Sequence, residues 1–180
     1  MTHVEVRLAG EGGQGLILGS VILAEAAAVY DGKNAVQTQS YGPESRGGAS
    51  KAEVIISDVE IDYPKAQSPD IVLVMSQEAA DKYAGDLKPE AVLVVDSTMV
   101  SRLPATGART LRFPITEVAR DKMGREIVAN IVALGVVCGL TGVVSQEGLT
   151  KAVLARVPKG TEQLNAKALE AGFALARENV

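Results

Sequence analysis

The sequence predicts an α/β fold: a doubly wound, mostly parallel sheet with helices on both faces and a C-terminal helical cover. Strand-like runs alternate with helical segments in the first part of the chain, and only helical patterns follow from Thr116 onward. Residues 70–75 and 91–95 form almost continuous apolar runs, which are typical of strands buried on both faces of a parallel sheet. With 180 residues, 47% of them hydrophobic, the chain is expected to form one domain over residues 1–180.

The N-terminal part of the chain is expected to form a strand, a turn and a helix. Val4, Val6 and Leu8 alternate with charged residues, which is the two-residue period of a strand. After a glycine-rich turn, residues 16–30 are rich in alanine and leucine and predict a helix. A glycine stop at residues 31–33 ends it.

The remaining elements follow from apolar runs, caps and helix-breaking residues. Further strands are expected at residues 34–38, 51–56, 70–75, 91–95 and 109–113. Residues 58–64 are expected to continue the third strand as a hairpin arm that ends at Pro64. Ser76, Ser145 and Thr161 are expected to cap helices. The predicted helices occupy residues 76–85, 116–122, 126–140, 145–157 and 161–175.

The turn after the first strand has the spacing G-x-G-x-x-G, with glycines at positions 10, 12 and 15. In such a βα turn one glycine makes the tight bend, one admits a diphosphate close to the backbone, and one lets the helix pack closely on the strand. Backbone N–H groups and the positive end of the helix dipole then favour an anion. An equally open alternative is that these glycines serve only tight packing.

Neighbouring residues disfavour two familiar nucleotide sites. A phosphate-hydrolysing loop would need Lys and Ser or Thr where Leu16 and Ile17 stand. A dinucleotide site would need an acidic residue after the second strand, but residues 34–39 end without one, and without an arginine for a ribose phosphate. Glu11 adds a carboxylate beside the proposed anion site, which is tolerable only if it points to solvent.

Composition excludes several classes of function. The net charge is −4, the pI is near 5.1 and no basic cluster appears along the sequence, which argues against nucleic acid and membrane surfaces as partners. Cys138 and His3 are the only residues of their kinds, so the chain can assemble no disulfide, zinc site or iron–sulfur site of its own. Cys138 is expected to be a buried, inert thiol and His3 an exposed bystander. The apolar run 127–140 is too short to span a bilayer, and no signal peptide is evident, which predicts a cytoplasmic protein.

Residues 39–50 form a second distinctive stretch, with three glycines, one proline and no apolar periodicity. Ordinary connections have about four to six residues, so a loop of this length is more often functional or disordered. Arg46 is the expected anchor, because its guanidinium can make two hydrogen bonds to a carboxylate or phosphate. Two consecutive turns with an internal pair between Arg46 and Glu44 are the alternative.

Taken together, these stretches closely resemble the gamma subunit of 2-oxoacid:ferredoxin oxidoreductases. The resemblance begins with the glycine turn at residues 10–15 and is most specific in residues 37–48. It continues over nearly the whole chain, through residues 52–57, residues 68–70, the helix that contains Asn130 and residues 157–161. The last of these segments is similar to members that act on 2-oxoglutarate or branched 2-oxoacids.

The resemblance implies a multi-subunit enzyme. In that family the complex decarboxylates a 2-oxoacid on thiamine diphosphate, passes electrons through iron–sulfur clusters to ferredoxin and transfers the acyl group to coenzyme A. Thiamine diphosphate, magnesium and the clusters are implied to belong to partner subunits: alpha, beta and a ferredoxin-like delta subunit. This chain is therefore expected to carry no catalytic residue or metal and to be inactive alone. Apolar surface meant for partners is expected to let the isolated chain self-associate.

The resemblance also assigns residues. Coenzyme A is expected to meet the glycine turn at Gly10, Gly12, Gly13, Gln14 and Gly15. Contacts with a partner or ligand are expected at Gln39, Ser40, Tyr41, Gly42, Pro43, Glu44, Arg46, Gly47 and Gly48. Two alternatives stay open at this point: an independent NAD(P)-binding reductase module, and a scaffold subunit that binds no ligand.

Overall fold

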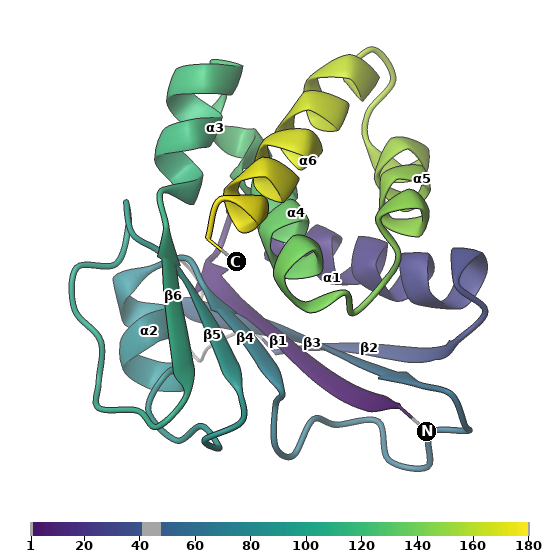
Figure 1. Cartoon of the computed structure of the whole chain (residues 1–180), viewed down its shortest axis with the longest axis vertical. Coiled ribbons are helices and arrows are strands. Elements are labelled where there is room, and N and C mark those ends of the chain that lie inside the picture. The colour runs from purple at the N-terminus through teal and green to yellow at the C-terminus, as the bar shows by residue number, and fades with distance from the viewer. Residues whose placement is uncertain (1, 41–47, 180) are drawn as a thin grey trace.

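The structure, a computed structural model, describes residues 2–40 and 48–179. Figure 1 shows one twisted sheet with a layer of helices packed on it. The strands are β1 (His3–Glu11), β2 (Asn34–Ser40), β3 (Ala49–Ser57), β4 (Ile71–Val74), β5 (Val92–Asp96) and β6 (Arg109–Phe113). The helices are α1 (Leu16–Glu25) with its π-helical continuation η1 (Ala26–Tyr30), α2 (Gln77–Tyr83), α3 (Ile115–Met123), α4 (Ala129–Thr141) preceded by the 3₁₀ turn η2 (Glu126–Val128), α5 (Gln146–Arg156) and α6 (Glu162–Arg177).

β1 lies in the middle of the sheet, whose strand order is β2-β3-β1-β4-β5-β6. β1, β4, β5 and β6 are parallel, whereas β3 runs antiparallel to both β1 and β2. Every strand except β3 therefore points the same way, which confirms the predicted α/β fold with a mostly parallel sheet. The β1–β3 ladder runs the full length of both strands, from His3 opposite Ser57 to Glu11 opposite Ala49.

The two faces of the sheet carry separate apolar cores. On one face, residues such as Val6, Leu8 and Val54 are fully buried beneath the layer that contains α1 and α4–α6 (Figure 1). On the opposite face, Val72 and Leu93 belong to a smaller core that includes residues of α2. Helices thus cover both faces as predicted, but very unequally.

Side-chain caps begin two of the helices as predicted. The hydroxyls of Ser76 and Ser145 accept hydrogen bonds from the backbone N–H groups three residues further on, at 3.2 and 2.9 Å. The predicted cap at Thr161 is wrong. Its hydroxyl donates to the carbonyl oxygen of Pro158 at 2.6 Å and accepts from the side-chain Nδ2 of Asn165 at 3.1 Å, but it accepts no hydrogen bond from a backbone N–H of α6.

Residues 58–64 form no strand, in contrast to the predicted hairpin arm. β3 ends at Ser57, and both of its edges are already paired, one with β1 and the other with β2. A further hairpin partner would need a third edge. Instead, the carboxylate of Asp58 accepts hydrogen bonds from Thr2 and forms an ion pair with Lys33, which anchors this segment beside the start of β1.

The apolar run predicted as a buried helix at residues 126–140 forms η2 and α4. All residues of α4 from Ala129 to Cys138 are buried, and Asn130 is the polar residue among them. None of the helices in residues 2–40 and 48–179 is long and apolar enough to cross a membrane. The run is therefore a central core helix, and its first turn is tighter than an α-helix.

α4 and α6 cross at two glycines, Gly135 and Gly172, and Figure 1 shows the two helices side by side. A Cβ atom on Gly135 would lie 2.9 Å from Cα of Gly172, and one on Gly172 would lie 2.8 Å from Cα of Gly135. Neither position has room for a methyl group. The two backbones touch because both residues are glycine.

We expect Gly172→Ala to destabilise the fold, although alanine is the better helix former by about 1 kcal/mol. Overpacking costs roughly 1–3 kcal/mol, and here the new methyl group would meet backbone atoms, which cannot move aside. Urea unfolding measures the free energy. Gly85→Ala, whose Cβ would lie 3.8 Å from Pro104, is the matched control and should change stability little. An unchanged midpoint for Gly172→Ala would contradict the close helix crossing.

Candidate functional site

The glycine turn joins β1 to α1 at the carboxyl edge of the sheet. The backbone N–H of Gln14 donates to the carbonyl oxygen of Glu11 at 3.2 Å and closes the turn. Gly13 (φ 93°) and Gly15 (φ 74°) have left-handed backbone conformations, which favour glycine, and Gly15 is the N-cap of α1. The structure therefore confirms a βα turn at this place.

Two of the glycines are required by packing. A Cβ atom on Gly10 would clash with the side chains of Gln14 and Leu16. A Cβ atom on Gly15 would lie 2.6 Å from Nδ2 of Asn130. Close packing favours glycine at both positions, and at Gly15 the positive φ does so as well.

Gly12 and Gly13 border open space instead. No atom lies within 4 Å of a Cβ atom built on either residue. Gly13 still needs glycine for its positive φ, but Gly12 has neither a packing neighbour nor a positive φ. The backbone N–H groups of Gly12, Gly13 and Gly15 donate to none of the described residues. They lie at the start of α1, whose first turn has no acidic side chain, so free donors and the helix dipole together suit an anion.

Two amide side chains hold the turn in place. Oε1 of Gln14 accepts a hydrogen bond from the N–H of Glu11 at 2.7 Å, and its Nε2 donates to the carbonyl oxygen of Met75 at 2.8 Å, just after β4. Asn130, buried in α4, donates from Nδ2 to the carbonyl oxygen of Gly15 at 3.0 Å. Gln14 is a predicted coenzyme contact, and the structure gives its side chain a role in bracing the ends of β1 and β4.

Two adjoining cavities open beside the turn. The larger, of about 350 Å³, is lined by the turn, the start of α4, residues 157–161 and α6. The smaller, of about 270 Å³, shares Gly13 and Ile127 with it and reaches Met75 and Thr116. α1 follows β1 on one face of the sheet and α2 follows β4 on the other. The cavities therefore lie at the switch point where open α/β sheets bind ligands.

The larger cavity has an apolar lining with one cationic group. Leu18, Ile127 and Leu164 contribute apolar surface. Arg125, which is exposed and forms no ion pair with a described residue, is the cation among the described lining residues. Glu11 is exposed and lines a different hollow, on the side of α2. Its carboxylate therefore lies outside these two cavities, whereas Glu126 is a lining residue of the smaller one.

The order of the strands argues against a dinucleotide site. In a dinucleotide-binding fold the second parallel strand lies next to the first and ends in the residue that holds a ribose. Here β3 lies between them, which separates the end of β2 from the glycine turn by two strand spacings, about 10 Å. β2 also ends with Gln39 and Ser40 instead of an acidic residue.

The described ends of the second predicted motif lie at the same carboxyl edge of the sheet. Ser40 ends β2, and Gly48 directly precedes β3, whose first residue pairs with Glu11. Gln39 is among the residues that line a hollow at this edge. Of the remaining predicted contacts, the following lie outside the described residues: Tyr41, Gly42, Pro43, Glu44, Arg46 and Gly47. The role of Arg46 therefore stays a prediction, and so does its pairing with Glu44.

Cys138 and His3 lie in unrelated places. Cys138 is 2% exposed in α4, and its thiol donates to the carbonyl oxygen of Val144 at 3.2 Å. Burial, with a smaller effect from the charge of Asp31, raises the pKa of this thiol to about 11, so it is protonated and unreactive at neutral pH. His3 is exposed, with Nε2 3.5 Å from a carboxylate oxygen of Glu5. Among the described residues, no three His, Cys, Asp or Glu side chains are grouped to hold a metal ion.

Comparisons with known proteins give one consistent family. Residues 5–175 match the family model described as pyruvate ferredoxin/flavodoxin oxidoreductase. The chain is 52% identical to 2-oxoglutarate synthase subunit KorC of Methanocaldococcus jannaschii, over 97% of this chain and 94% of the relative. It is 36% identical to ketoisovalerate oxidoreductase subunit VorA of Methanothermobacter thermautotrophicus, over 99% of this chain and 37% of the relative. The crystal structure of the keto/oxoacid ferredoxin oxidoreductase gamma subunit from Geobacter sulfurreducens matches with a TM-score of 0.91 and 54% identity, covering 99% of this chain and 98% of that one.

The chain belongs to the pyruvate ferredoxin/flavodoxin oxidoreductase family, whose members here share both its sequence and its α/β fold. Within that family it is a gamma-type subunit of a 2-oxoacid:ferredoxin oxidoreductase, one component of a multi-subunit enzyme. This confirms the resemblance seen in the sequence and disfavours the independent NAD(P)-binding reductase.

We expect Gln14→Ala to loosen the braced turn, because it leaves the N–H of Glu11 and the carbonyl oxygen of Met75 without their partner. The free energy of unfolding should fall by roughly 1–2 kcal/mol, as measured by chemical denaturation. Gln163→Ala is the matched control, since the side chain of Gln163 is exposed on α6 and makes no hydrogen bond to a described residue. Equal stabilities of the two variants would contradict the bracing role.

Proposed function

We propose that the glycine turn binds the diphosphate of coenzyme A, within a complex whose 2-oxoacid substrate is 2-oxoglutarate. Gly12 carries the proposal. It is a glycine without a packing or conformational reason, as expected where a phosphate must approach the backbone closely. The free N–H groups around it supply hydrogen bonds, and Arg125 at the rim of the adjoining cavity supplies a positive charge.

The adjoining cavity favours coenzyme A over a bare phosphate. Coenzyme A continues beyond its diphosphate as a long, largely uncharged arm, and the cavity offers it apolar side chains. Ile127 is 74% exposed and Leu18 is 38% exposed, so a bound arm would remove apolar surface from water. The task of this chain is then to hold the phosphates and to shield the arm.

2-Oxoglutarate is supported as the substrate by the degree of similarity. Identity is 52% to the 2-oxoglutarate synthase subunit and 36% to the ketoisovalerate oxidoreductase subunit. Decarboxylation on thiamine diphosphate with magnesium, and electron transfer through iron–sulfur clusters to ferredoxin, belong in this proposal to the alpha, beta and delta subunits. A chain with one cysteine supplies too few thiolates for a cluster.

Gly12→Val is expected to block coenzyme A without unfolding the chain. The new side chain meets no atom of the protein at Cβ, but it fills the space beside the free N–H groups. In the reconstituted complex, we expect 2-oxoglutarate alone to reduce the clusters at the wild-type rate. The apparent affinity for coenzyme A should fall at least about tenfold, a loss of about 1.4 kcal/mol or more. Stopped-flow absorbance with and without coenzyme A measures both effects.

Gly107→Val is the matched control, because Gly107 is an exposed loop residue with its nearest neighbours, atoms of Pro89, at 4.0 Å from the added Cβ. Thermal melts of both variants test their folding. An unchanged response to coenzyme A in the folded Gly12→Val complex would leave the ligand-free scaffold as the role of this chain. Faster reduction by pyruvate or 2-oxoisovalerate than by 2-oxoglutarate would contradict the proposed substrate.

A further inference from the structure

The face of the sheet opposite the helical layer carries a group of positive charges. Four residues from β1, β3, the β3–β4 connection and α2 form it, and we call them the basic face: Arg7, Lys51, Lys65 and Lys82. No basic cluster is visible along the sequence because these residues are spread from position 7 to position 82. The strand pairing of β1 with β3 and the position of α2 bring them together.

The aromatic ring of Tyr83 lies close to three of these charged groups. The guanidinium carbon of Arg7 lies 5.6 Å from the centroid of its ring, Nζ of Lys51 lies 5.8 Å away and Nζ of Lys82 lies 5.4 Å away. Each distance is within the range of a cation–π interaction. One ring cannot offset the mutual repulsion of three cations, so the group needs negative charge.

Glu53 supplies only part of that charge. Its Oε1 accepts hydrogen bonds from Nε of Arg7 at 2.8 Å and from Nζ of Lys51 at 3.1 Å, and its side chain is 7% exposed. Lys65 and Lys82 are exposed and form no ion pair with a described residue. Glu53 thus pairs with two of the four cations of the basic face, and Lys65 and Lys82 are left without a carboxylate partner among the described residues.

Two further carboxylates, from β1 and α2, are already engaged. Glu5 accepts hydrogen bonds from the N–H groups of Gln67 and Ser68, at 2.8 and 2.7 Å. Asp81, next to Lys82 in α2, pairs with Arg102 at 2.9 Å. The positive excess of the basic face is therefore open to a group from outside the described chain.

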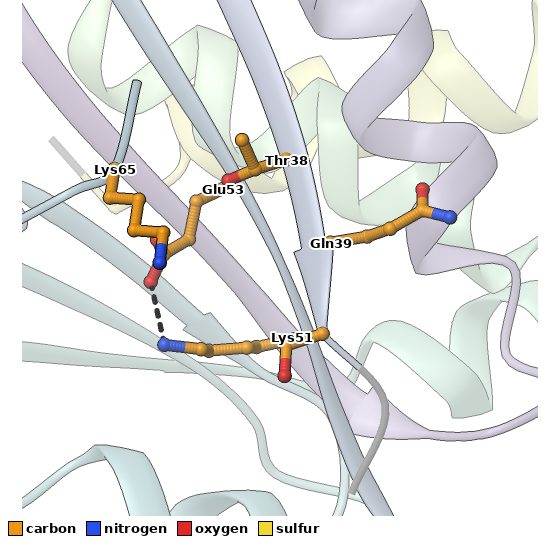
Figure 2. A pocket seen from close by; sticks show the side chains of 6 residues that line it. Thr38, Gln39, Lys51, Glu53 and Lys65 are labelled. Carbon is orange, nitrogen blue, oxygen red and sulfur yellow. Dashed lines mark hydrogen bonds and ion pairs between the residues drawn. The ribbon is translucent and has the colours of Figure 1, made fainter. Parts of the chain in front are cut away.

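A hollow of about 310 Å³ lies on this face (Figure 2). Lys51, Lys65 and Glu53 line it together with the hydroxyl groups of Thr38 and Ser40. Figure 2 shows the ammonium groups of both lysines on the same side as Glu53, whereas Gln39 points the opposite way. The hollow offers ammonium and hydroxyl donors, which are the groups that bind carboxylates and phosphates.

We propose that the basic face docks an acidic surface of another subunit of the oxidoreductase complex. The proposal rests on the chain being a subunit, and it is independent of coenzyme A binding at the glycine turn. A protein surface with several separate carboxylates can pair individually with Lys51, Lys65 and Lys82. A compact dianion in the hollow would instead lie beside the carboxylate of Glu53, which repels it.

The test is the rate at which the chain assembles with the remaining subunits of its complex. Lys65→Glu/Lys82→Glu reverses the two exposed charges that form no ion pair with a described residue. It also removes the contact between Lys82 and the ring of Tyr83, so a thermal melt tests whether the fold is kept. We expect association to slow by about tenfold or more and to lose most of its salt dependence, because charge complementarity acts mainly on the association rate. Lys122→Glu/Lys167→Glu makes the same charge change at exposed, unpaired lysines of α3 and α6 and should assemble nearly as the wild type does.

Equal assembly rates and salt dependence for the two double variants would overturn the proposal. Binding of inorganic phosphate that is lost in the basic-face variant, with assembly unchanged, would also overturn it and assign the hollow to a small anion. The measurement contains no coenzyme A, and Gly12→Val should assemble normally in it. Failure of this proposal is therefore distinguishable from failure of the proposed coenzyme site.

Discussion

The pairing of β1 on both of its edges is the constraint on which the rest of the structure depends. β1 is held along its full length by β3 and over part of it by β4, so the place where the chain leaves the sheet is fixed from two sides. Because α1 and α2 then cover opposite faces, a crevice forms at the ends of β1 and β4, and Gln14 spans it to reach Met75. A register shift of one residue would exchange Val6 and Leu8 with Arg7 and place a charge in the main core.

Elements with a local signal could be predicted from the sequence, and elements that depend on distant partners could not. The apolar runs of β4, β5 and α4 indicate by themselves that these segments are buried. The serines at positions 76 and 145 indicate where two helices begin. The reversed direction of β3 depends on pairing with β1, about 46 positions away in the ladder between Arg7 and Glu53. Residues 58–64 have the composition of a strand, yet both edges of β3 are already paired, so they cannot form a hairpin with it.

The candidate site likewise has one feature that the sequence predicted and others that only the structure shows. The motif G-x-G-x-x-G predicted a βα turn, but the motif does not show that its glycines have different structural roles. The structure separates Gly10 and Gly15, which packing requires, from Gly12, which borders open space. A pattern of residue types cannot make this distinction, because the neighbours of Gly15 include Asn130 from a helix more than a hundred residues later. The basic face is a further case, since only the fold assembles its charges.

The lengths of the relatives bear on the proposed docking of a partner at the basic face. In VorA the matched segment is 37% of a longer chain, whereas KorC of M. jannaschii and the G. sulfurreducens gamma subunit match over 94% and 98% of their lengths. A covalent link keeps neighbouring modules at high effective concentration. A module that works as a separate subunit must hold its partners through its own surface.

A large exposed apolar patch would risk aggregation before assembly, whereas opposite charges steer association and keep the free subunit in solution. Because the helical layer covers the main core and α2 covers the smaller one, the remaining part of the opposite face is where this fold can display charge without a cost to either core.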